Sequence, residues 1–279
     1  MRIDSHQHFW RVARGDYSWM SPDDETLCRD YGPEDLRPLL DRHGIDRTIL
    51  VQAAPTVAET QFMLAMAESA PFVAGVVGWA DFAAPDAPDT IATLAGNPLV
   101  VGFRPMVQDI ADDDWLLRAD LGGVFCALVE RRLVFDALVL PRHLSRTLVT
   151  ADRHPDLSIV VDHGAKPFIR EGVLDPWRAD MAALAARPNV VCKLSGLVTE
   201  ARPEWRTDDL RPYVDHLLRV FGPERLLWGS DWPVANLAGG YDRWRAASLD
   251  LIAGLSEAEK DAVLGANAAR IYLSEHGRR

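Results

Sequence analysis

The sequence predicts an α/β fold, a (β/α)8 TIM barrel formed by residues 1–279 as a single domain with extra C-terminal helices. Three observations lead to this prediction. Eight short apolar runs recur along the chain, amphipathic helix patterns lie between them, and no GxGxxG turn follows the first run. Because that turn is typical of the nucleotide-binding open sheet, the doubly wound alternative is the weaker interpretation.

The apolar runs are rich in Val, Ile, Leu and aromatic residues, and each is too short for a helix. They occupy positions 2–10, 47–53, 72–80, 99–106, 133–140, 158–164, 190–196 and 225–233. Successive runs start 25 to 45 residues apart, which leaves room for one return helix each time. Apolar strands that alternate with helices indicate a parallel sheet covered by those helices.

Two segments between the runs carry clear helix signals. Pro33 begins the first and Gly44 follows its end, which is the usual placement of these two residue types. In the second, apolar residues repeat at helical spacing over 209–221, with Thr207 as the expected N-cap.

The C-terminal part and one long connection complete the arrangement. From residue 256 the chain has the pattern of one or two further helices, and Ser256 and Glu259 are spaced as a capping box. Residues 11–32 form an unusually long connection after the first run and contain Trp19. Long connections of this kind often serve as lids or binding loops.

Composition excludes several classes of partner. The chain is 48% hydrophobic and 25% charged, as globular proteins are, and its formal net charge is −11. That charge repels phosphate backbones and anionic lipid, so we expect neither nucleic acid nor a membrane as partner. The three cysteines form no CxxC pair, no apolar run approaches 20 residues, and the N-terminus lacks a signal peptide. We therefore expect a cytoplasmic protein with a small-molecule substrate, and a homo-oligomer is left open.

Polar residues collect where four of the predicted strands end. The first run ends in Asp4, His6 and His8, the sixth in His163, the seventh in Lys193 and Ser195, and the eighth in Ser230 and Asp231. A barrel of this type carries its active site at the carboxyl ends of the strands, so these side chains are the candidates for chemistry.

The histidine pair suggests a metal site. Side chains alternate along a strand, so Asp4, His6 and His8 are expected on one face, where two imidazoles can converge on a point. A divalent ion bound by His6 and His8 could take its third ligand from Asp231. The alternative is a pair of histidines that merely hydrogen-bond within a polar strand end.

Asp231 is the carboxylate with the strongest functional signal. It follows an apolar strand, where an unpaired charge is costly, so it is paired, ligating or catalytic. A general base toward a bound water fits this position, and a helix cap or an ion pair with Arg104 is the alternative.

Further residues near the strand ends are candidates for substrate binding. Arg104 and Lys193 either contact a polar substrate or balance nearby carboxylates, and Lys166 either pairs with an anionic group or is a solvated loop residue. Tryptophans near strand ends could stack on a sugar ring or simply fill the core, namely Trp10, Trp79, Trp228 and Trp232. The absence of a GxSxG motif disfavours a serine hydrolase.

Four motifs in order, HxH, DHGAKP, KLSG and WGSDWP, resemble the amidohydrolase superfamily over essentially the whole chain, down to GANAARIY near its end. Within it, the chain most resembles the amidohydrolase-2 branch of sugar lactonases and 2-pyrone-4,6-dicarboxylate lactonases. The resemblance implies that His6 and His8 form the first-strand metal pair. It also implies that His163 ligates metal or polarises the substrate carbonyl, and that Asp231 takes a proton from the attacking water.

The resemblance also predicts the reaction. Binuclear relatives bridge two metals through a lysine or glutamate on the middle strands, but here those strands offer Arg104 and Asp136, so a two-metal centre is not expected. One zinc-like ion or none is left open, because the lactonases that this chain resembles need not depend on metal. The predicted reaction is hydrolysis of a sugar-acid lactone such as an L-fucono- or L-rhamnonolactone. The alternatives are hydrolysis or decarboxylation of a pyrone- or aromatic-derived carboxylate, and a non-catalytic barrel that binds a sugar acid.

Overall fold

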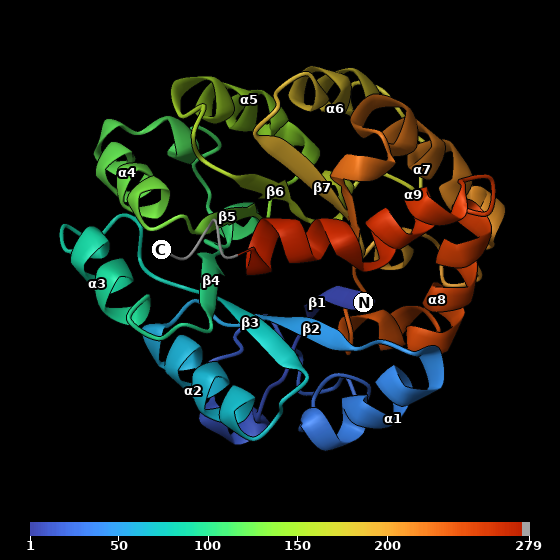
Figure 1. Cartoon of the computed structure of the whole chain (residues 1–279), viewed down its shortest axis with the longest axis horizontal. Helices are drawn as coiled ribbons and strands as arrows, with labels where there is room; N and C mark the ends of the chain where they lie inside the picture. Colours follow the sequence, from blue (N-terminus) through green and yellow to red (C-terminus); the bar gives the residue numbers. More distant parts are fainter. Residues whose placement is uncertain (275–279) are drawn as a thin grey trace.

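Eight parallel strands form a nearly closed barrel in the computed structural model, which describes residues 1–274 (Figure 1). The strands are paired in chain order, each with the next. They are β1 (Ile3–Gln7), β2 (Arg47–Val51), β3 (Val73–Gly78), β4 (Val100–Phe103), β5 (Val134–Ala137), β6 (Ile159–Val161), β7 (Val190–Leu194) and β8 (Leu226–Trp228). The predicted (β/α)8 barrel is confirmed, and every strand lies within one of the eight apolar runs.

The barrel closes through residues that follow β1 and β8. The backbone N–H of Asp231 donates to the carbonyl of His6, and that of His8 donates to the carbonyl of Trp232, both at 2.8 Å. A parallel bridge between Gln7 and Trp232 accompanies them. The closing contacts therefore use the residues of the HxH and WGSDWP motifs themselves.

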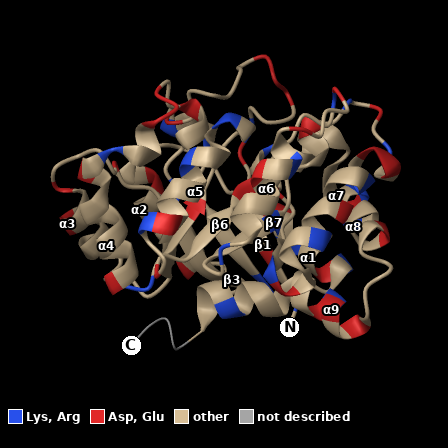
Figure 2. Cartoon of the chain, turned by 90° about the horizontal axis from the view of Figure 1, so that it is seen from above, with Lys and Arg blue, Asp and Glu red and all other residues tan. Residues whose placement is uncertain are grey.

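Helices surround the strands as an outer ring (Figure 1). They are α1 (Pro33–His43), α2 (Val57–Glu68), α3 (Ala87–Leu94), α4 (Gly122–Glu130), α5 (Leu144–Arg153), α6 (Trp177–Ala185), α7 (Thr207–Phe221), α8 (Gly240–Leu251) and the short α9 (Glu257–Asp261). Acidic and basic residues are interspersed over these helices in the view of Figure 2. Among the described residues, no helix is long and apolar enough to cross a membrane.

Helix ends follow the predicted signals with one exception. Pro33 begins α1, and Gly44 ends it in left-handed backbone with φ 61°. Ser256 and Glu259 form the predicted capping box of α9. The prediction of Thr207 as N-cap was wrong, because Thr207 is already the first residue of α7. The cap is instead made by the Asp209 carboxylate, which accepts the backbone N–H of Arg206 at 2.8 Å.

The C-terminal segment covers the end of the barrel where the strands begin (Figure 1). Two π-helical turns, Ala262–Ala266 and Ala269–Leu273, follow α9, and Tyr272 packs with the apolar side chains inside the barrel. A Cβ at Gly265 would lie 2.3 Å from the carbonyl oxygen of Met1, so only glycine allows this close approach. Asn267 donates to the carbonyls of Pro223 and Leu226, both at 2.8 Å.

The long connection over 11–32 is tied to the carboxyl end of the barrel. The Trp19 indole N–H donates to the carbonyl of Ala53 at 2.7 Å, and the Tyr17 hydroxyl donates to Glu59 at 3.0 Å. Trp10 and Tyr31 pair through an antiparallel bridge at the base of the connection. The segment therefore folds back across the strand ends, as a binding loop would.

Candidate active site

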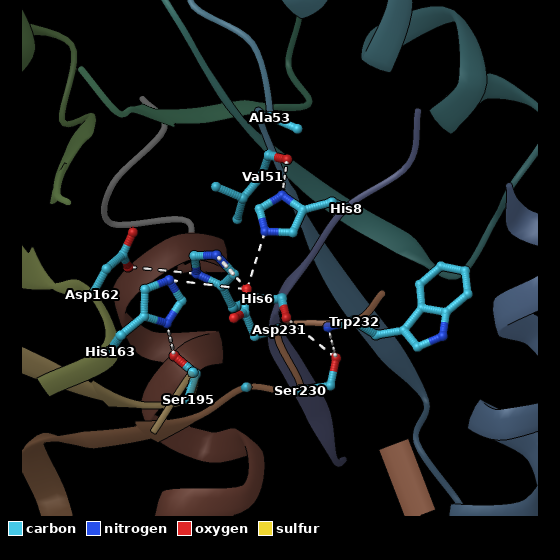
Figure 3. A network of polar contacts seen from close by, with 12 residues as sticks. His6, His8, Val51, Ala53, Asp162, His163, Ser195, Ser230, Asp231 and Trp232 are labelled. Carbon is cyan, nitrogen blue, oxygen red and sulfur yellow. Dashed lines mark hydrogen bonds and ion pairs between the residues drawn. The ribbon is translucent and has the colours of Figure 1, made fainter. Parts of the chain in front are cut away.

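Three histidines and one aspartate meet at the carboxyl end of the barrel (Figure 3). The ring centroid of His6, in β1, is 4.9 Å from that of His8 and 4.5 Å from that of His163. Asp231 Oδ1 lies 3.2 Å from His8 Nε2, 3.7 Å from His6 Nε2 and 3.9 Å from His163 Nε2. All four residues are buried. Residues from three separate motifs thus form one cluster around a carboxylate.

The backbone at Asp231 and His163 directs both side chains into this cluster. Asp231 has φ 56° and His163 has φ 54°, a left-handed conformation that is strained for residues other than glycine. His163 is also held by Ser195, whose Oγ is 2.9 Å from His163 Nδ1. Its other nitrogen, Nε2, therefore faces Asp231 (Figure 3).

Gly196, the glycine of the KLSG motif, leaves the space that the His163 ring occupies. Its φ is 61°, and a Cβ there would lie 2.4 Å from His163 Nδ1 and 3.1 Å from Asp231 Oδ2. Both the backbone conformation and the close approach therefore require glycine.

Burial and mutual contacts set the protonation states of the cluster. Burial acts to raise the pKa of Asp231, but the imidazoles of His163, His8 and His6 outweigh it and hold that pKa below its usual value. Burial lowers the pKa of His163 to about 4 and that of His6 well below its usual 6.5. At neutral pH an ionised carboxylate therefore faces two neutral imidazoles.

These residues fit a divalent metal ion. One ligand atom each of His6, His163 and Asp231 lies within 4.8 Å of the other two. Metal ligands must be neutral imidazoles and ionised carboxylates, which is the state found here. The sequence named His8 beside His6 and Asp231 as a ligand and gave His163 as a residue that ligates metal or polarises the carbonyl, and the spacing of donor atoms groups His163 with His6 and Asp231.

His8 is held between two oxygen atoms. Its Nδ1 is 2.8 Å from the carbonyl of Val51, an acceptor only, so Nδ1 carries a proton. Its Nε2 lies 3.2 Å from Asp231 Oδ1, so the ring is fixed next to the carboxylate at the centre of the cluster.

Arg104 lies next to the cluster and is almost fully buried. Its guanidinium donates to Asp162 Oδ2 at 3.2 Å and to both oxygens of Gln52, and NH1 is 3.3 Å from His6 Nε2. The structure therefore pairs Arg104 with Asp162 and not with Asp231. Gln52 was not identified in the sequence analysis. It could have been found as the polar residue that directly follows the apolar residues of β2.

Comparison with known proteins shows the family of this chain. The family described as Amidohydrolase matches residues 3–273. The chain belongs to the amidohydrolase family. It is 49% identical to an L-fucono-1,5-lactonase of Burkholderia ambifaria, over 88% of this chain and 86% of that protein. It is 41% identical to an L-fucono-1,5-lactonase of Burkholderia multivorans, over 98% of this chain and 96% of that protein.

Solved structures share the fold of this amidohydrolase. A crystal structure of an amidohydrolase from Burkholderia multivorans with bound zinc has a TM-score of 0.92 and 41% identity, covering 98% of this chain and 99% of that one. A probable 2-pyrone-4,6-dicarboxylic acid hydrolase from Acinetobacter baumannii has a TM-score of 0.81 at 17% identity, covering 97% and 98%, which shows the common fold alone. The resemblance to the amidohydrolase-2 branch is confirmed.

Four other predicted residues of this amidohydrolase have partners other than Asp231. Lys193 is completely buried within β7, where it pairs with Asp136 and Asp162. Lys166 is partly exposed, and its Nζ is 3.9 Å from Glu200. Trp10 and Trp232 are both buried, and each contacts the ring of Tyr31.

Asp4 does not share the face of His6 and His8, so that prediction was wrong. The β1–β2 register shifts between Asp4 and Gln7, which breaks the alternation of side chains. Asp4 Oδ1 instead accepts the backbone N–H of Ser230 at 2.8 Å and that of His6 at 3.2 Å. Its carboxylate supports the backbone of the site from outside the cluster.

A cavity of about 550 Å³ opens at the carboxyl ends of β3 and β4. Its wall includes the aromatic residues Trp19, Trp79, Phe82 and Trp115, and it reaches Pro105, the neighbour of Arg104. Of the tryptophans predicted to stack on a substrate, Trp79 is the one that lines this cavity. Trp19 belongs to the long connection that the sequence marked as a binding loop.

Proposed function

We propose that this amidohydrolase hydrolyses a sugar-acid lactone to the aldonic acid, and that Asp231 accepts the proton of the attacking water. The observation that carries the proposal is the ionised Asp231 carboxylate within 3.9 Å of three imidazoles at the carboxyl end of the barrel. Two relatives at 49% and 41% identity are named L-fucono-1,5-lactonase, which supports a lactone ester as the bond that is broken.

The expected substrates are L-fucono-, L-rhamnono- and related aldonolactones. A more distant relative, 24% identical over 62% of this chain, is the L-rhamnono-gamma-lactonase of Scheffersomyces stipitis. The cavity at the carboxyl ends of β3 and β4, about 550 Å³, is within the range of small-ligand sites and offers tryptophan faces on which a sugar ring can stack.

His6, His163 and Asp231 are the residues that would hold a divalent ion, with His8 adjacent. A bound ion of this kind lowers the pKa of water and polarises a carbonyl. Asp231 is a weak base by itself because its pKa is held low, so it needs an acidified water as its partner. We therefore propose that the activity depends on a divalent metal.

The chain's own residues supply the remaining steps. Asp231 Oδ1 takes the proton as the water oxygen bonds to the ring carbonyl carbon, and His163 Nε2, 3.9 Å from Oδ1, faces the same space. The Arg104 guanidinium adds positive potential beside the developing oxyanion. The ring C–O bond then breaks, and the proton on Asp231 passes to the departing alkoxide.

A carboxylate substrate is less well supported. That alternative uses Arg104, Lys166 and Lys193 as clamps. Each of these cations already has a carboxylate partner: Arg104 pairs with Asp162, Lys193 with Asp136 and Asp162, and Lys166 with Glu200 at 3.9 Å. A neutral lactone needs no cation as its binding partner.

Proton release from a panel of 1,4- and 1,5-aldonolactones tests the proposal. We expect turnover of at least one 6-deoxy lactone, a loss of about 10²- to 10⁴-fold in kcat/KM for Asp231→Asn, and full activity in the surface control Asp208→Asn. Chelation should abolish activity and zinc should restore it. Turnover of no lactone, or wild-type activity of Asp231→Asn, would contradict the proposal.

A further inference from the structure

A second set of metal-ligand atoms lies deeper in the barrel than Asp231. One donor atom each of His6, Asp136 and Asp162 lies within 4.8 Å of the other two. All three residues are completely buried. Two carboxylates and an imidazole are donors that divalent transition metals accept. By geometry alone, this set is as suitable for an ion as the first.

The Lys193 ammonium already occupies this set. Its Nζ lies 2.5 Å from Asp136 Oδ2, 3.0 Å from Asp162 Oδ1 and 3.1 Å from His6 Nδ1. The ammonium donates a hydrogen bond to Asp136 Oδ2 and forms an ion pair with Asp162 Oδ1. The Lys193 side chain has no exposed surface. The cation is therefore a fixed part of the barrel interior.

The other oxygens of the two carboxylates are engaged as well. The Tyr272 hydroxyl donates to Asp136 Oδ1 at 2.7 Å, and Arg104 donates to Asp162 Oδ2 at 3.2 Å. The Tyr272 ring also lies below the ammonium, with its centroid 5.4 Å from Nζ. Asp162 Oδ1 has no hydrogen bond of its own, so the Lys193 ammonium at 3.0 Å is the cation that balances it.

We propose that the Lys193 ammonium takes the place of a second metal ion in this amidohydrolase. It fills the ligand set of His6, Asp136 and Asp162, excludes a second ion, and packs against the His6 ring on its Nδ1 side. Lys193 is a positioning residue, because it is buried beneath His6 and acts through that ring. The inference goes beyond lactone hydrolysis and stands without it, since its test measures bound metal in the absence of substrate.

Removal of the ammonium should create a site for an ion. Lys193→Ala, dialysed against Zn²⁺ or Mn²⁺ and then against metal-free buffer, should retain one metal equivalent per chain more than the wild-type protein by elemental analysis. The surface control Lys260→Ala should match the wild type. The double variant Lys193→Ala/Asp136→Asn should lose the extra equivalent, because it lacks one of the three ligands.

Thermal stability gives an independent readout. Without metal, Lys193→Ala should melt about 10 °C below the wild type, because two buried carboxylates lose their cation. Mn²⁺ should restore much of this loss in Lys193→Ala and little of it in the double variant. A purely structural lysine would give the same loss with no recovery in Mn²⁺.

Two results would overturn the proposal: folded Lys193→Ala that binds no more metal than wild type, or an extra equivalent that persists in the double variant. Should Lys193→Ala be recovered only as aggregate, refolding with and without Mn²⁺ decides. A soluble yield that rises several-fold in Mn²⁺ supports the proposal, and equal yields overturn it.

Discussion

Gly196→Ala should displace His163 and reduce activity while the barrel stays folded. The added Cβ would lie 2.4 Å from His163 Nδ1, whereas ordinary contact begins at 3.4 Å, so the ring has to move by about 1 Å. A misplacement of this size at a reacting group costs roughly 10²-fold in rate. The strain of alanine at φ 61° adds a destabilisation of about 1 kcal/mol.

The assay is lactone hydrolysis, with zinc affinity measured in parallel because His163 is a proposed ligand. Gly44→Ala is the matched control, since Gly44 has the same φ of 61° but nothing within 4 Å of an added Cβ. Gly44→Ala should therefore show the loss of stability without the loss of activity. If Gly196→Ala kept wild-type kcat/KM and zinc affinity, the placement of His163 by this glycine would be refuted.

Three further predictions address stability and substrate binding. Burial raises the pKa of Glu59 from 4.5 to about 7, so the folded state keeps a proton that the unfolded state has lost. The free energy of unfolding should therefore fall by about 3 kcal/mol as pH rises from 4.5 to 7. Chemical denaturation at several pH values should show that Glu59→Gln removes this pH dependence of the free energy of unfolding. An unchanged pH dependence in the variant would contradict the assignment to Glu59. In the same assay, Arg104→Lys should lower the free energy of unfolding by about 3 kcal/mol, because buried acceptors on Asp162 and Gln52 lose donors. The exposed Arg142→Lys should lower it little. Trp79→Ala should raise KM for lactones several-fold with kcat nearly unchanged, and an unaltered KM would place the substrate elsewhere.

Much of the fold and part of the site could be predicted from the sequence. The eight strands were recognisable because each is a short apolar run. His6, His163 and Asp231 stood out because each is a polar residue at the end of such a run. The carboxyl ends of barrel strands converge, so their proximity followed from the fold class.

The remainder depends on three-dimensional detail that no local pattern carries. Asp136 and Lys193 meet inside the barrel although 57 positions separate them, and each is a single charge in an apolar strand. The register shift after Asp4 reverses the expected facing of that residue. Trp232 packs against Phe9 and Tyr31, because the left-handed backbone at Asp231 changes the direction of the chain at this point.

The position of Tyr272 has a consequence for how the protein is made. Its hydroxyl completes the shell around Asp136, although 136 positions separate the two residues and all eight strands precede Tyr272 in the chain. During synthesis the interior charges of the barrel stay incomplete until this segment leaves the ribosome. A chain cut short before Tyr272 should thus lack both its lower cover and the last donor to its buried carboxylates.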